Sequence, residues 1–246
     1  AVLLAAYNVL LGRCCRQDDV AVGTVTANRT RKELEGLVGF FANTLVLRTD
    51  LSGDPTFRQL LGRVSKVALA AYDNQELPFD KLVELLDPQR HRNQAPLFQV
   101  ALVLENMPLE LPDRSGLHVQ PILDIDNGTA KYDMAVLVSE EGGKLTGQVE
   151  YSTDLFDAET IGRMMGALGT LLAAAVEDPD RPISRLPLLD QAERRRVLAD
   201  SGATDAGPAP LVCLHHLVEQ HVRKTPDRVA VRCAGRELTY GELDRQ

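Results

Sequence analysis

The chain has few cysteines for its length, and their spacing does not suggest disulfides. Its 246 residues include 4 cysteines and no Cys-x-x-Cys pair. Cys14 and Cys15 are adjacent, which is too strained for an ordinary disulfide, and Cys213 and Cys233 lie far apart in the sequence. We therefore expect four reduced thiols and a cytoplasmic protein.

Positive charge and long apolar runs are scarce as well. The chain has 27 Lys and Arg against 35 Asp and Glu, a formal net charge of -8. An acidic chain repels phosphate backbones, so nucleic acid is not an expected partner. The most apolar stretch, residues 1–11, is interrupted by Asn8 and is shorter than the roughly 20 residues that span a bilayer. It also lacks the basic region of a signal peptide, so we expect no membrane partner.

The usual signatures of an active site are missing too. The sequence has no Gly-rich phosphate loop, no dinucleotide fingerprint, no Gly-x-Ser-x-Gly and no metal-ligand spacing. His215 and His216 are neighbours on a predicted helix, so their side chains point about 100° apart, and His221 lies on a further face. We interpret all three as solvated surface residues. His91 and His118 have no obvious Asp or Ser partner, so we expect no metal site and no catalytic residue.

What the chain does contain is an ordinary globular composition, with 44% hydrophobic and 25% charged residues. At about 150 residues per domain, the length predicts one to two domains. The sequence begins inside a helical pattern without Met and ends within the first turn of another. We therefore expect a piece of something longer.

Hydrophobic periodicity predicts an α/β fold with a mixed sheet covered by helices. Apolar residues at helical spacing predict helices over 1–13, 55–71, 78–85 and 158–176. β-rich segments predict strands over 20–27, 44–49, 97–104, 117–123, 132–138 and 144–151. The run 97–104 reads as a central strand covered on both faces, and Gly142 and Gly143 mark a hairpin. Asp54 with Pro55 at the first position, and Asp157, are the expected helix starts.

The character of the chain changes after Asp178. Prolines break regular structure, a charged helix is predicted over 191–198, and residues 200–210 have linker composition. Beyond the linker the pattern predicts a helix over 213–224, a strand over 229–233 and a helix from Tyr240. We divide the chain into a lobe (1–186), a linker (187–213) and a short α/β start of a second domain (214–246).

Five blocks resemble, in order, the motifs of nonribosomal peptide synthetase condensation domains. They are residues 38–48 (Val-Gly-Phe-Phe-Ala-Asn-Thr-Leu-Val-Leu-Arg), 74–80 (Asn-Gln-Glu-Leu-Pro-Phe-Asp), 90–99, 131–133 (Lys-Tyr-Asp) and 151–156 (Tyr-Ser-Thr-Asp-Leu-Phe). The third block matches loosely, because His91, Gln94 and Ala95 depart from the pattern. The resemblance implies a chloramphenicol acetyltransferase-like lobe.

The far end of the chain resembles the region that comes after such a domain. Leu188, Leu189 and residues 193–198 are similar to the linker, while residues 213–215 and 238–243 are similar to the opening of an adenylation domain. The nucleotide-binding motifs of that domain come later, so we expect no ATP binding. The family's His-His-x-x-x-Asp-Gly motif is missing, because residues 215–221 lack the Asp-Gly and lie beyond the linker. The resemblance therefore implies the C-terminal lobe alone.

In that family, the domain joins aminoacyl or peptidyl thioesters held on the phosphopantetheine arms of carrier domains. The implied partners are the N-terminal lobe, the upstream and downstream carrier domains and the adenylation domain, with no cofactor bound directly. We expect the fragment to be inactive alone and to form a homodimer through its exposed face. The alternatives are a scaffold that seats carrier and adenylation domains, and a coenzyme A-dependent acyltransferase lobe. The adenylation-like end argues against the latter.

Five residues are candidates for the wall of the substrate tunnel or for the contact between lobes. Asn43 either lines the cleft or satisfies nearby backbone groups. Arg48 either forms an ion pair between lobes or is a solvated charge at a strand end. Thr24 and Thr26 are candidates for the acceptor side of the tunnel. Asp133 either orients the sheet edge or is a polar residue at a strand start.

Overall fold

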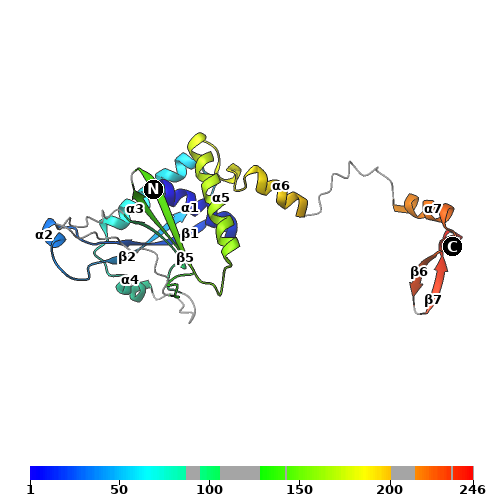
Figure 1. Cartoon of the computed structure of the whole chain (residues 1–246), viewed down its shortest axis with the longest axis horizontal. Coiled ribbons are helices and arrows are strands. Elements are labelled where there is room, and N and C mark those ends of the chain that lie inside the picture. Colours follow the sequence, from blue (N-terminus) through cyan, green and yellow to red (C-terminus); the bar gives the residue numbers. More distant parts are fainter. Residues whose placement is uncertain (87–94, 106–127, 142, 201–213, 234, 246) are drawn as a thin grey trace, which may run out of the picture. The chain divides into compact units, whose positions relative to one another are not determined.

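The computed structural model describes residues 1–86, 95–105, 128–141, 143–200, 214–233 and 235–245 (Figure 1). The chain divides into two compact units, Ala1–Gln191 and Ala192–Gln246. The predicted strand over 117–123 and residues 201–213 of the predicted linker lie outside the described residues. No helix in the described part is both long and apolar enough to cross a bilayer.

A five-stranded mixed sheet forms the centre of the first unit. Its strands are β1 (Asp19–Thr26), β2 (Asn43–Asp50), β3 (Val100–Glu105), β4 (Met134–Glu141) and β5 (Lys144–Tyr151). Their order is β2-β1-β3-β4-β5. β1, β3 and β4 run parallel, and the edge strands β2 and β5 are antiparallel to their neighbours. The predicted mixed sheet and its hairpin at Gly143 (φ 76°) are confirmed.

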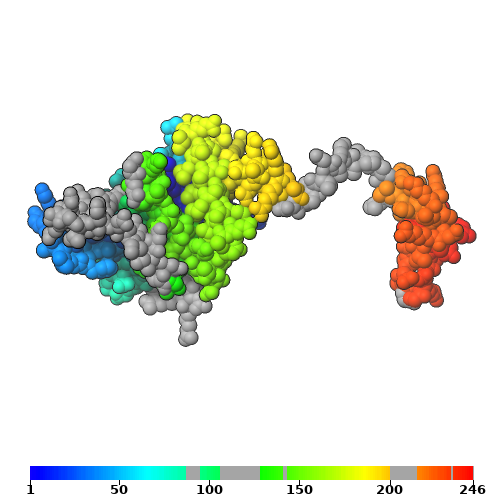
Figure 2. Space-filling model, viewed as in Figure 1, coloured from blue at the N-terminus to red at the C-terminus, as the bar shows by residue number. Residues whose placement is uncertain are grey.

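Three helices pack on the sheet and build the core. They are α1 (Val2–Cys15), α3 (Phe57–Asp73) and α5 (Ala158–Glu177). α1 contacts both of the others, and its residues from Leu4 to Gly12 are all buried. In the space-filling view only a sliver of α1, in dark blue, is visible beside α5 (Figure 2). α3 instead buries one stripe, Phe57, Leu60 and Val64, as an amphipathic helix does.

On the opposite side of the sheet an aromatic ring packs against the middle of β1. Phe98 is 1% exposed. A Cβ atom at Gly23, in the middle of β1, would lie 2.1 Å from the Phe98 ring, so only glycine fits under it. This contact brings the start of β3 against β1, where Gly23 pairs with Ala101.

The start of α3 differs from the prediction. Its N-cap is Thr56, whose hydroxyl accepts from the Gln59 N–H while the Gln59 side chain accepts from the Thr56 N–H, a capping box. Asp54 does not cap the helix, and Pro55 is not its first residue. The Asp54 carboxylate instead accepts from the backbone N–H and hydroxyl of Ser184, at 3.0 and 2.8 Å.

Ser184 belongs to residues 178–188, which we call the strap. The strap includes the short 3₁₀ helix η1 (Ile183–Arg185) and pairs with the start of α3 through a β-bridge between Thr56 and Pro182. Ile183 and Leu186 are buried. The strap, which contains Pro179, Pro182 and Pro187, is therefore irregular, as expected, yet it packs against the rest of the first unit.

Several smaller expectations are corrected. β3 begins at Val100 because Leu97 takes a left-handed turn (φ 71°), and of its residues only Ala101 is buried. The central strand is therefore not covered on both faces along its length. In α4 (Phe79–Leu86), Val83 is buried while Leu86 is 60% exposed. On α5 the predicted cap Asp157 is confirmed, but Val176 is exposed.

The second unit consists of short elements. They are α6 (Gln191–Asp200, whose first residue belongs to the first unit), α7 (Leu214–Lys224), β6 (Val229–Cys233), β7 (Arg236–Thr239) and α8 (Tyr240–Asp244). β6 and β7 form an antiparallel pair. The helices and β6 were expected; β7 was not, because a four-residue strand with two charged residues carries no alternating apolar pattern.

Candidate functional site

Asn43 joins two of the motif blocks. It opens β2, and its side-chain N–H groups donate to the carbonyls of Gln75 and Leu77 at 2.8 and 2.7 Å. Its side-chain oxygen accepts from the N–H groups of Thr44 and Phe79 at 2.9 and 3.1 Å. Every donor and acceptor position of the amide is thereby used. Asn43 therefore holds the turn between α3 and α4 against β2, which fits the backbone-satisfying alternative.

Thr26, at the end of β1, reinforces the same junction. Its hydroxyl donates to the side-chain oxygen of Gln75 at 2.6 Å and accepts from the Asn28 N–H at 3.3 Å. Asn28 has a left-handed backbone (φ 52°), which asparagine tolerates better than most residues. Thr26 is half-buried and engaged within the chain.

Arg29 shapes the β1–β2 loop, which comprises residues 27–42 and contains the short helix α2 (Lys32–Glu35). Its guanidinium donates to carbonyls along the loop and lies 4.4 Å from the centre of the Phe41 ring. The carbonyls belong to Leu34, Glu35, Leu37 and Gly39. Arg29 was not predicted from the sequence, where it is one of several charged residues in a polar segment.

The clamped loop presents apolar side chains to solvent. Val38 is 105% exposed and Phe40 is 93% exposed, and Leu37 is also exposed. Side chains of this size rarely project fully from a loop whose backbone is fixed by several hydrogen bonds unless another surface covers them.

The remaining blocks continue the same band of contacts. Phe98 packs edge-on against Phe79, with ring centres 5.8 Å apart, and lies 5.2 Å from the Tyr132 ring. The Asp133 N–H donates to the Gln99 carbonyl, and the Asp133 carbonyl accepts from the Ser152 N–H, each at 3.0 Å. Asp133 is half-buried just before β4. The described parts of all five motif blocks are thus linked into one band.

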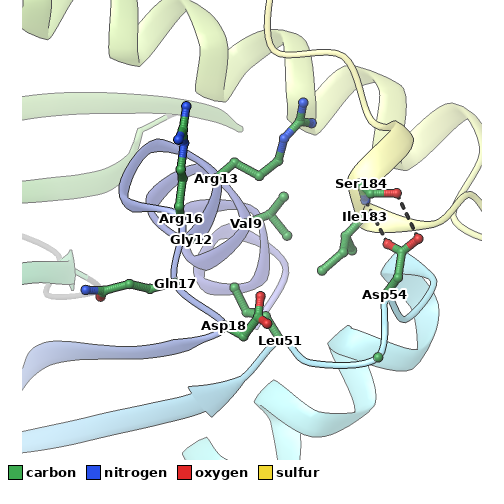
Figure 3. Close-up of a pocket in the computed structure, with 11 residues that line it drawn as sticks. Val9, Gly12, Arg13, Arg16, Gln17, Asp18, Leu51, Asp54, Ile183 and Ser184 are labelled. Carbon is green, nitrogen blue, oxygen red and sulfur yellow. Dashed lines mark hydrogen bonds between the residues drawn. The ribbon is translucent and has the colours of Figure 1, made fainter.

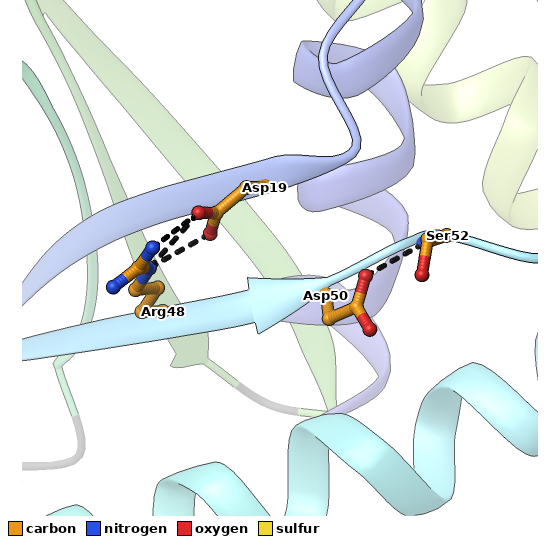
Figure 4. A network of polar contacts seen from close by, with 4 residues as sticks. All are labelled: Asp19, Arg48, Asp50 and Ser52. Atoms are coloured by element: carbon orange, nitrogen blue, oxygen red, sulfur yellow. Dashed lines mark hydrogen bonds and ion pairs between the residues drawn. The ribbon is translucent and has the colours of Figure 1, made fainter.

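Arg48 lies on β2 and pairs with Asp19 on β1 (Figure 4). The Arg48 Nε atom donates to both carboxylate oxygens of Asp19, at 2.9 and 3.0 Å. The hydrogen bond from Arg48 holds the pKa of Asp19 below its ordinary value. The Ser52 hydroxyl and N–H lower the pKa of Asp50 in the same way. Arg48 is exposed, as the solvated alternative requires, and its ion pair lies within the sheet.

Thr24 is buried on β1 and lines an apolar cavity of 360 Å³. The other lining residues come from the start of α1 and from β2, α3, β3 and β4; among them are Leu4, Tyr72, Leu102 and Val138. Thr24 and Tyr72 are the hydroxyl-bearing residues among mostly apolar walls, which suits an apolar group.

A second cavity, of 560 Å³, lies between the end of α1 and the strap (Figure 3). Its charged groups are partly occupied: Arg13 donates to the Leu186 carbonyl and Asp54 is bound by Ser184. The bonds from Ser184 keep the pKa of Asp54 low. Neither histidine nor cysteine is among its lining residues, and its other charged groups are Arg16 and Asp18.

The described residues of the first unit contain no histidine. His91 and His118 lie outside the described residues, and the described histidines are on α7. His215, His216 and His221 are all exposed, as expected. The expectation that the side chains of His215 and His216 diverge is wrong, because their ring centres lie 4.2 Å apart.

A family model for the condensation domain matches residues 1–198. The chain belongs to the condensation domain family. The match covers the sheet, the helices on it and the strap, so the band of motif blocks lies within it. The resemblance to this family and the chloramphenicol acetyltransferase-like mixed fold are confirmed.

The curated relatives of this condensation-family chain are peptide synthetases. It is 43% identical over 245 residues to malpinin synthetase of Mortierella alpina, covering 98% of the chain and 3% of that protein. It is 41% identical over 255 residues to a dimodular nonribosomal peptide synthase of Bacillus subtilis, covering 100% of the chain and 10% of that protein. The chain thus spans a tenth or less of these two relatives.

Solved structures agree on the fold. A four-domain nonribosomal peptide synthetase bound to AMP and glycine matches with a TM-score of 0.72 and 22% identity, over 98% of this chain and 19% of that one. The X-domain from teicoplanin biosynthesis matches with a TM-score of 0.63 and 28% identity, over 76% of this chain and 43% of that one.

Proposed function

We propose that residues 1–186 are the C-terminal lobe of a condensation domain that forms a peptide bond between two carrier-bound thioesters. The observation that carries the proposal is the band that links the described parts of five family motif blocks, in a chain without a His-His-x-x-x-Asp-Gly motif. A match to less than half of the teicoplanin X-domain chain is consistent with one lobe of two. The base or amine-positioning histidine would then come from the other lobe.

In this proposal the lobe holds reactants rather than reacting with them. A dry tunnel between lobes orients the acceptor amine toward the donor thioester and keeps out water that would hydrolyse it. The β1–β2 loop, clamped by Arg29, supports this role because it offers Val38 and Phe40 to a covering surface. The phosphopantetheine arms belong to the upstream and downstream carrier domains, and the lobe binds no cofactor of its own.

We further propose that residues 187–213 are a linker and residues 214–246 the opening of an adenylation domain, in a cytoplasmic synthetase. The second unit supports this reading, because none of its described residues is buried. A two-stranded pair with two short helices is marginal without further chain to cover it.

The decisive experiment measures dipeptide formation from aminoacyl-loaded donor and acceptor carrier domains. The 246-residue chain alone is expected to give no product above background. Co-expression with a matching N-terminal lobe is expected to restore the product, whereas the same lobe with both motif histidines changed to alanine is not. Robust product from the chain alone would overturn the proposal.

The scaffold alternative is separated by truncation at Pro187. The shortened lobe keeps its buried anchors, Ile183 and Leu186, so it is expected to fold. If truncation abolishes docking of the adenylation domain and the reassembled lobes still form dipeptide, the last 60 residues serve as a scaffold. Unchanged docking would contradict that role.

A further inference from the structure

The first turns of α7 bring three metal-binding side chains together. His215, His216 and Glu219 are exposed, and each offers a ligand atom, all of which lie within 4.8 Å of one another. Glu219 follows the two histidines by three and four residues, the spacings at which helix side chains are neighbours. The cluster lies beyond residues 1–198, so the condensation-family match does not account for it.

We infer that His215, His216 and Glu219 form a site for a divalent first-row transition metal, with zinc as the reference ion. Two imidazole nitrogens and one carboxylate oxygen are a ligand set that zinc accepts. Tetrahedral zinc places its ligand atoms about 3.4 Å apart, given bond lengths of about 2.0–2.2 Å. The ligand atoms of the three exposed side chains, within 4.8 Å of one another, would have to move closer to take up that spacing on a bound ion. The fourth position remains open to water or to a donor from a partner.

The surroundings define which ion fits. Magnesium and calcium prefer oxygen ligands, so a site with two imidazoles selects against them. The positive end of the helix disfavours any cation, and the carboxylate of Glu219 opposes that effect. His221 does not join the cluster; its ring stacks on Tyr240, with ring centres 5.3 Å apart. It therefore serves as a matched control on the same helix.

The test is a calorimetric titration of the full chain with zinc chloride. Thiolates also bind zinc, so Cys14, Cys15, Cys213 and Cys233 are first changed to serine. One ion per chain is expected. His215→Asn and His216→Asn are each expected to weaken binding at least about tenfold, and Glu219→Gln several-fold. His221→Asn is expected to leave the affinity unchanged.

Copper(II) gives a second readout that does not depend on heat. Its electron paramagnetic resonance spectrum is expected to show coupling to two imidazole nitrogens in the cysteine-free chain and to one in either histidine variant. Circular dichroism checks that α7 persists in each variant. No zinc binding at millimolar metal, or equal binding after both His215→Asn and His216→Asn, would overturn the inference. So would a loss in His221→Asn as large as in the cluster variants.

Discussion

The two units of the chain differ most in what they bury. The first closes a core in which Ala5, Val22, Leu60 and Leu171 are fully buried. In the second, none of the described residues is buried, although α7, β6 and α8 are well formed. Local signals are therefore enough to specify helices and strands, but only packing between distant segments makes a cooperative fold.

The largest expected effect comes from filling the space under Phe98. Gly23→Val forces side-chain atoms into the ring and is expected to destabilise the first unit by about 3 kcal/mol in urea unfolding. Hydrogen exchange of peptides from residues 214–233 is expected to stay unchanged, because the second unit shares none of this core.

Gly162→Ala is the matched control for that substitution. Gly162 lies on α5, where an added Cβ meets nothing within 4 Å. This change is expected to stabilise the helix by about 0.5–1 kcal/mol. A Gly23→Val chain as stable as the wild type would contradict the packing described for Phe98.

Asn43→Ala is expected to have the next largest effect. It leaves the carbonyls of Gln75 and Leu77 and the N–H of Phe79 without their partner, at a cost of about 2 kcal/mol. The measurement is hydrogen exchange in residues 74–80, which is expected to be faster in Asn43→Ala than in the wild type. Asn74→Ala removes one exposed bond, to the Ala70 carbonyl, and is expected to cost under about 1 kcal/mol. Equal costs for the two variants would argue against Asn43 as a junction.

A pair of matched substitutions compares the units directly. Thr56 and Thr239 both cap helices through a capping box, with Gln59 and Glu242 as the third residues. Thr56→Ala is expected to lower the free energy of unfolding of the first unit by about 1 kcal/mol. Thr239→Ala is expected to reduce helicity locally and leave that unfolding transition in place. A shift of the transition by Thr239→Ala would show that the two units unfold together.

The smallest effect concerns the ion pair of Asp19 and Arg48. Because the pKa of Asp19 is lowered on folding, the pair contributes stability above the ordinary carboxyl pKa and loses it as the pH falls below about 4. Both side chains are exposed, so the contribution is small and screened by salt. Asp19→Asn is expected to make the free energy of unfolding fall slightly less as the pH is lowered, as measured by urea unfolding at several pH values. A steeper loss of stability at low pH in the variant would contradict this expectation.

Structure was predicted correctly from the sequence where it depends only on residues close together in the chain. Asp157 stands directly before an apolar helical stripe, and it caps α5. Asp54 has the same local appearance, yet it binds Ser184, which is 130 residues away. No property of residues 50–60 records the position of the strap, so the partner of Asp54 could not be predicted. The cap at Thr56 could have been, because Thr56 and Gln59 have the spacing of a capping box.

The candidate site was predictable as a set of motif blocks but not as a set of contacts. Asn43 was identified, and its partners on the α3–α4 turn were not. Arg29 was missed because its role depends on a loop folding back over its own guanidinium. The proximity of His215 and His216 was missed because rotamers, and not backbone direction alone, determine where neighbouring rings lie.

The strap gives the first unit a mechanical property. Residues 178–188 run back across the start of α3 and are held there by backbone bonds to Pro55, Phe57 and Arg58 and by the Arg58–Asp180 ion pair. A pull applied beyond Gln191 would load these bonds before it reached α5, so tension on that end of the first unit would be taken up first at the strap and only then at the sheet.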